Sequence, residues 1–148
     1  RDAQESRGLG DVYKRQIFAN ALNNLDIKFA WIVNSEDGLD EISPYARTNV
    51  IQLKNNVISE IIIDPKELNV NADKFENLVG DDAEFNANKI LGIFKGEDND
   101  FSKAVCLNAA AGLIVNETHE EFAEAYKDAR ENILSNKVIK HLEKIQNA

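Results

Sequence analysis

The sequence contains a single cysteine, Cys106, so it has no second thiol with which a disulfide could form. An intramolecular disulfide and a cysteine-based zinc cluster are therefore excluded. Its apolar runs, such as residues 109–115, fall far short of the roughly 20 residues that a transmembrane helix requires. No basic-then-apolar signal segment opens the sequence. We therefore expect a cytoplasmic protein that has no contact with a membrane.

Basic residues are in the minority, with 17 Lys and Arg against 26 Asp and Glu and a formal net charge of −9. This excess of negative charge disfavours nucleic acid and anionic membranes as partners. The sequence also lacks a glycine-rich loop of the kind that cradles phosphate groups with backbone amides. An acidic domain of this kind would need a cation between itself and a phosphate ligand.

The chain of 148 residues, 43% of them hydrophobic, suits one domain with a real core. Residues 1–16 differ from the rest, because they have no apolar periodicity and carry one more basic than acidic residue. Gly8 and Gly10 would weaken any helix there. We predict that residues 1–16 are a non-native or disordered leader and that the domain covers residues 17–148.

The first half of this domain is predicted to form a helix followed by strands. Apolar residues recur at helical spacing over 17–25. Residues 28–33 lack polar alternation after the first residue, which predicts a strand covered on both faces, as in a parallel sheet. Residues 49–54 and 57–63 predict an edge hairpin that turns at Asn55 and Asn56. A helix leading directly into such a strand indicates the α/β class.

Two further helices are predicted after residue 80. The first begins with Asp81 as its cap and Glu84 as the partner of the cap, and it ends before Gly96. The second covers residues 102–115 and is apolar on nearly every face. We expect it to be a central buried helix.

A third helix is predicted to begin at a capping box formed by Thr118 and Glu121. Residues 135–136 interrupt its pattern, and a last short helix follows. The sequence contains His119, next to Thr118 of the capping box, and His141 on the last helix. Neither histidine has a partner at metal-ligand spacing. We therefore expect both histidines to have surface roles.

The acidic residues are concentrated after the first predicted strand, with four carboxylates in the six residues 36–41. Open α/β sheets generally bind ligands at the carboxyl ends of their strands. Two carboxylates about 5 Å apart repel by roughly 3 kcal/mol at an effective dielectric near 20, and a hard divalent cation relieves this repulsion. The cluster therefore indicates a magnesium site, with an exposed and merely solvated loop as the alternative.

The second predicted helix contains two further polar candidates. Cys106 has no nearby base in sequence, and most buried cysteines of this kind are inert packing. Asn108 is the one amide in that apolar helix. We interpret it as a hydrogen-bonded core asparagine rather than a ligand.

Three stretches of the sequence resemble the anthranilate phosphoribosyltransferase family. They are residues 37–43 (DGLDEIS), residues 80–87 (GDDAEFNA) and residues 107–111 (LNAAA), in the order and approximate spacing of the family. The resemblance covers about residues 17–148. It implies the C-terminal part of an α/β catalytic domain of the nucleoside phosphorylase and phosphoribosyltransferase type, in which sheet strands and an edge β-hairpin pack with helices.

The resemblance also implies an activity, which is transfer of the phosphoribosyl group of phosphoribosyl pyrophosphate to anthranilate in tryptophan biosynthesis. It implies that Asp40 and Glu41 bind the Mg²⁺ associated with the pyrophosphate. The phosphate loop, the basic substrate residues and the dimerising domain of the family lie N-terminal to the matched part. We therefore expect a homodimer only for the complete enzyme and no activity for the isolated chain. A pyrimidine nucleoside phosphorylase and a non-catalytic acidic interaction domain are the alternatives.

Overall fold

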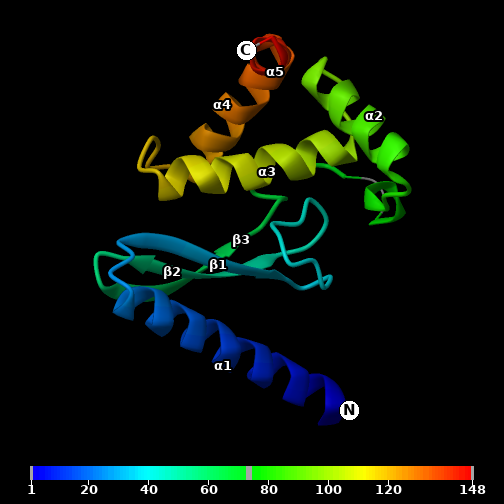
Figure 1. The fold of residues 1–148 in the computed structure, drawn as a ribbon. Coiled ribbons are helices and arrows are strands. Elements are labelled where there is room, and N and C mark those ends of the chain that lie inside the picture. The colour runs from blue at the N-terminus through cyan, green and yellow to red at the C-terminus, as the bar shows by residue number, and fades with distance from the viewer. Residues whose placement is uncertain (1, 73–74, 148) are drawn as a thin grey trace.

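The computed structural model describes the backbone of residues 2–72 and 75–147, and the side chains from residue 13 onward within these ranges. Helix α1 lies on one face of a three-stranded sheet and α3 on the other, with α2, α4 and α5 beyond α3 (Figure 1). The elements in chain order are α1 (Asp2–Asn24), β1 (Phe29–Ser35), β2 (Thr48–Lys54), β3 (Val57–Ile63), the 3₁₀ helix η1 (Phe75–Leu78), α2 (Ala83–Phe94), α3 (Asp100–Val115), α4 (Phe122–Leu134) and α5 (Lys137–Gln146).

The predicted hairpin is confirmed as β2 and β3, which pair antiparallel from Lys54 opposite Val57 to Thr48 opposite Ile63. The two turn residues, Asn55 and Asn56, have φ of 48° and 67°. Asparagine tolerates this left-handed region better than most residues, because its short side chain can hydrogen-bond locally. The pair therefore closes the two-residue turn, and β3 lies at an edge of the sheet order β1-β2-β3.

Strand β1 contacts α1 on one face of the sheet and α3 on the other, but its side chains are only half-buried except for Ser35. Its neighbour β2 runs antiparallel to it, with Phe29 opposite Lys54 and Ser35 opposite Thr48. Among the described residues, all three strands pair antiparallel, so the expectation of a parallel sheet is wrong for this part of the fold. A continuous apolar run reports burial on both faces of a strand, but it does not report the direction of the neighbouring strand.

Helix α1 begins at Asp2, so the backbone of residues 2–16 is helical in spite of Gly8 and Gly10. A helix that is already formed extends by one hydrogen bond per residue at low cost, and this explains how a segment without an apolar stripe continues it. The foreign origin of the segment stays a prediction, and residue 1 lies outside the described residues.

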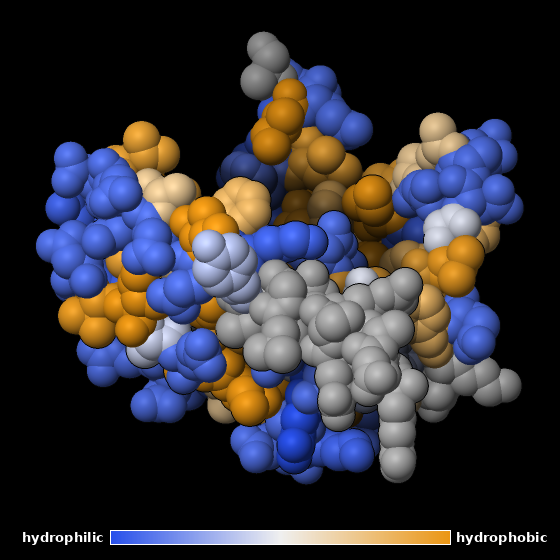
Figure 2. Space-filling model, turned by 90° about the horizontal axis from the view of Figure 1, so that it is seen from below, coloured by the Kyte–Doolittle hydropathy of each residue, from blue (hydrophilic) through white to orange (hydrophobic). Residues whose placement is uncertain are grey.

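The apolar residues of the C-terminal half of α1 lie mostly away from the sheet. Phe18 is 63% exposed, whereas Ala19 is completely buried. Seen from the side of α1, apolar patches lie among hydrophilic residues on the surface (Figure 2). Among the side chains that the structure describes in α1 and β3, the exposed large apolar ones are Tyr13, Ile17, Phe18, Val57 and Ile62.

The core lies between the sheet and helices α3 and α4. Its largest fully buried side chains include Ile42, Val50, Ile93 and Leu107. Helix α3 is central, as predicted, but one of its faces is open, because Val105 is 40% exposed. Within the described ranges, no helix is long and apolar enough to cross a bilayer.

The helix caps differ from the prediction in two places. Helix α2 is capped by Asp82, whose side chain accepts from the Phe85 N–H at 2.8 Å, rather than by Asp81. Helix α4 begins after Glu121 with no side-chain cap, so the predicted cap Thr118 lies three residues before the N-cap position, and its Oγ1 accepts from Asn116 Nδ2 at 3.1 Å. For α2, the sequence pattern admits either of the two neighbouring aspartates as the cap, and the path of the preceding backbone decides between them.

Candidate metal site at the acidic loop

The four clustered carboxylates lie in the acidic loop, residues 36–47, which joins β1 to β2 near η1 and the N-terminal end of α3 (Figure 1). The loop is closed at its base by the Glu36 N–H, which donates to Arg47 O at 2.9 Å. Above this base, the Ser35 N–H donates to Leu39 O at 3.0 Å. Gly38, with φ of 93°, allows the tight turn between them. The backbone therefore doubles back directly after β1.

Asp37 holds the loop together. Its Oδ2 accepts from the Ser43 hydroxyl at 2.5 Å, and its Oδ1 accepts from the Leu39 N–H at 3.3 Å. Ser43 is completely buried, and its Oγ also accepts from the N–H groups of Tyr45 and Ala46. Asp37 is thus a structural part of the loop.

Asp40 and Glu41 are both exposed, and no hydrogen bond or ion pair joins their side chains to the residues that the structure describes. Partial burial and the neighbouring charge of Asp40 raise the pKa of Glu41 above its ordinary value. The tip of the loop therefore carries two adjacent carboxylates, and neither has a hydrogen-bond or ion-pair partner among the described residues.

The donor set of Asp40 and Glu41 fits Mg²⁺. This cation commonly takes one or two protein carboxylates and completes its octahedron with water and substrate phosphate oxygens. Among the described residues, no cluster of three or more His, Cys, Asp or Glu side chains is suited to a metal. At such a site the protein would supply only two of the ligands of Mg²⁺, and water and phosphate oxygens would supply the others. This is the usual form of a site that binds a metal together with a phosphate.

Asn108 of α3 reaches the loop directly after this pair. Its Oδ1 accepts from the Ile42 N–H at 2.9 Å, and its Nδ2 donates to Ile42 O at 3.1 Å. The same Nδ2 donates to Ala104 O at 2.9 Å within the helix. The prediction that Asn108 is hydrogen-bonded is confirmed, although its side chain is half-buried rather than buried.

Arg47 is a basic residue at the end of the loop that the sequence patterns do not single out. Its Nε donates to Asp64 Oδ2 at 2.9 Å. This hydrogen bond and the attraction between the two charges raise the pKa of Arg47, and the same hydrogen bond lowers the pKa of Asp64. Arg47 therefore ties the acidic loop to the residue after β3.

The remaining candidates lie away from the loop. Cys106 is buried in the core, and burial raises the pKa of its thiol to about 11, so it is protonated at neutral pH. His119 Nε2 lies 3.7 Å from Asp128 Oδ2, and His141 is exposed on α5. His119 lies in the turn between α3 and α4 and His141 lies on α5, so neither histidine is part of the acidic loop.

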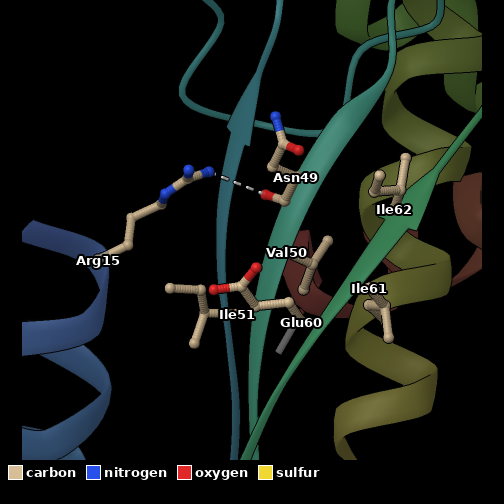
Figure 3. A pocket seen from close by; sticks show the side chains of 7 residues that line it. All are labelled: Arg15, Asn49, Val50, Ile51, Glu60, Ile61 and Ile62. Carbon is tan, nitrogen blue, oxygen red and sulfur yellow. Dashed lines mark hydrogen bonds between the residues drawn. The ribbon is translucent and has the colours of Figure 1, made fainter. Parts of the chain in front are cut away.

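A cavity of about 360 Å³ lies on the other face of the sheet, between α1 and the strands (Figure 3). Arg15 points into it and donates from Nη1 to Asn49 O at 3.4 Å. Its other lining residues are Val50, Ile51, Glu60, Ile61 and Ile62. No residue of the acidic loop lines this cavity, so it is separate from the carboxylate pair.

The fold and the loop together define an α/β domain with an exposed carboxylate pair after a strand, a class that can hold a divalent cation. Residues 8–138 match the glycosyl transferase family, a/b domain, and the chain belongs to this family.

The chain is 70% identical over 140 residues to anthranilate phosphoribosyltransferase of Pelagibacter ubique (strain HTCC1062), covering 95% of this chain and 42% of that protein. The chain thus spans about two fifths of the length of this curated relative. The crystal structure of anthranilate phosphoribosyltransferase from Thermus thermophilus matches with a TM-score of 0.76 and 27% identity, over 85% of this chain and 37% of that one.

The enzyme of the same name from Saccharomyces cerevisiae, in complex with PRPP and Mg, has a TM-score of 0.67 and 22% identity. The match covers 76% of this chain and 33% of the yeast chain. At this level of identity, the likeness establishes the fold alone.

Proposed function

We propose that the chain is the metal-binding part of an anthranilate phosphoribosyltransferase. The observation that carries the proposal is the pair of adjacent, exposed carboxylates of Asp40 and Glu41 on a loop that other residues hold in place. Its 70% identity to the Pelagibacter ubique enzyme supports the choice of reaction within the family. Asp40 and Glu41 would hold Mg²⁺ that accompanies the pyrophosphate of phosphoribosyl pyrophosphate.

In the proposed reaction, the amine nitrogen of anthranilate forms a bond to C1 of the ribose while the bond from C1 to the pyrophosphate oxygen breaks. Pyrophosphate leaves with the bonding electron pair, and the amine loses a proton. When bound, Mg²⁺ neutralises the negative charge that develops on the leaving group. The chain supplies the two carboxylates, and Asp37 and Ser43 keep the loop closed around them.

Binding of the two substrates needs basic and amide groups that the acidic loop does not offer. The chain covers 42% of the Pelagibacter ubique protein. We therefore assign the phosphate loop, the anthranilate site and the contacts of a homodimer to the part of the family's chain that these residues do not span. On this proposal, the 148 residues alone have no turnover.

A chimera tests the proposal, in which this chain replaces the matching part of the Pelagibacter ubique protein. We expect Mg²⁺-dependent conversion of anthranilate, measured as loss of anthranilate fluorescence at saturating phosphoribosyl pyrophosphate. The double variant Asp40→Ala/Glu41→Ala should lose most of this activity, whereas Glu36→Ala, which removes a carboxylate from the same loop, should retain it. Full activity of the double variant, or phosphorolysis of a pyrimidine nucleoside by the chimera, would refute the assignment.

A further inference from the structure

We propose that Asn108 is a positioning residue for the carboxylate pair. Its side-chain amide fixes the backbone of Ile42 and thereby the direction in which Asp40 and Glu41 leave the loop. This inference rests on the proposed magnesium role of the pair, and it adds a residue from a different element, α3, to that site.

The contact between Asn108 and Ile42 joins residues that are 66 positions apart in the chain. The carboxamide of Asn108 bonds both the N–H and the C=O of Ile42, so it fixes the orientation of that peptide as well as its position. Its third bond, to Ala104 O, holds the amide on the helix. Ile42 is completely buried, so these two bonds satisfy backbone groups that have no contact with solvent in the folded protein.

The carboxylate pair lies between two fixed points of the backbone. On its N-terminal side, Leu39 O accepts from the Ser35 N–H at 3.0 Å. On its C-terminal side, Ile42 is held by Asn108. Asp40 and Glu41 are the two residues between these anchors, and they have no described partner of their own. Their directions are therefore set by the anchors.

Mg²⁺ demands near-ideal octahedral geometry, so the direction of its ligands affects its affinity. Residues that orient metal ligands typically contribute 10–100-fold to metal affinity. Removal of the Asn108 amide leaves the charge of the loop unchanged. A loss of affinity in such a variant would thus report the geometry of the pair rather than its charge.

The test compares Asn108→Ala with a matched control, Asn86→Ala, in the chimera. Asn86 makes the same two-point contact elsewhere, since its Oδ1 accepts from the Asp81 N–H at 3.1 Å and its Nδ2 donates to Asp81 O at 2.9 Å. The readouts are calorimetric Mg²⁺ affinity at saturating phosphoribosyl pyrophosphate, and amide hydrogen exchange at Ile42 with Leu53 as the internal reference.

We expect Asn108→Ala to weaken Mg²⁺ binding by roughly tenfold or more. Exchange at Ile42 should accelerate by at least a similar factor, while exchange at Leu53 should stay unchanged. Turnover at saturating Mg²⁺ should fall far less than the Mg²⁺ affinity. The control Asn86→Ala should change none of these. Unchanged Mg²⁺ affinity in a folded Asn108→Ala chimera would overturn the proposal.

Two further measurements keep the outcomes separate. If Asn108→Ala does not fold, the unmodified chimera still decides, because a bound ligand must protect the groups that position it. Saturating Mg²⁺ should then slow exchange at Ile42, and an unchanged rate would overturn the positioning role. If the variant Asp40→Ala/Glu41→Ala retains Mg²⁺ affinity, the proposed function fails. If only Asn108→Ala retains it, the positioning role alone fails.

Discussion

Asp37 should stabilise the fold, although the sequence places it in a cluster of similar carboxylates. Its bond from the buried Ser43 hydroxyl is 2.5 Å long, and its second oxygen accepts from the Leu39 N–H. A hydrogen bond to a charged group contributes about 1.5–3 kcal/mol. Asp37 is exposed, so we place the effect of Asp37→Ala in the lower part of this range. The variant should lower the free energy of unfolding by about 2 kcal/mol.

The assay is urea denaturation of the 148-residue chain at pH 7 in the presence of a chelator, with a double-mutant cycle of Asp37→Ala and Ser43→Ala. Because Ser43 also serves Tyr45 and Ala46, only the coupling energy isolates the Asp37 bond. We expect a coupling of about 1–2 kcal/mol. With an m-value of about 2 kcal/mol per M, Asp37→Ala should lower the midpoint by about 1 M urea.

Glu36 is the matched control, because it is the adjacent carboxylate and its side chain has no hydrogen bond among the described residues. Glu36→Ala should change the unfolding free energy by less than about 0.5 kcal/mol. The reasoning would be refuted by equal effects of Asp37→Ala and Glu36→Ala, or by a coupling near zero.

Three further predictions concern the fold. Asp82→Ala should lower the unfolding free energy by about 1 kcal/mol, because it removes the cap of α2. The control Asp81→Ala should lower it by less than about 0.5 kcal/mol. Equal effects of the two variants in urea titrations would contradict this prediction. Asn56→Gly should raise the unfolding free energy by about 0.5 kcal/mol, because φ is positive there, and an unchanged urea midpoint would argue against the turn. Burial raises the pKa of Cys106 from 9.0 to about 11, so the neutral thiol stabilises the fold below pH 9 and this contribution is lost as the pH rises toward 11. Between pH 9 and pH 11, the unfolding free energy of the unmodified chain should therefore fall by at most about 3 kcal/mol more than that of Cys106→Ala. An identical fall in the two proteins would contradict the raised pKa of Cys106.

Local patterns predicted the elements whose structure depends on neighbouring residues. The hairpin at Asn55 and Asn56 follows from two β-rich runs and two residues that tolerate positive φ. The break before α5 is likewise local. The direction of β1 relative to β2 is not local, because it depends on how the chain returns through the acidic loop.

The site was predicted in part for the same reason. The sequence indicates an acidic loop after a strand, and the structure places it there. The sequence alone does not distinguish Asp37 from Asp40 and Glu41. The difference arises from the Ser43 hydroxyl, which bonds Asp37, and from Asn108, which contacts Ile42 from 66 residues away. One available signal was the amide itself, since a single asparagine in an apolar helix needs a partner.

The central claim is that Asp40 and Glu41 bind Mg²⁺ for phosphoribosyl transfer. The most direct measurement is calorimetric titration of Mg²⁺ into the chimera with phosphoribosyl pyrophosphate bound, compared with the isosteric double variant Asp40→Asn/Glu41→Gln. We predict a binding heat for the unmodified chimera and its loss in the double variant, with Glu36→Gln as an unaffected control. Equal Mg²⁺ affinity in the chimera and the double variant would contradict the account.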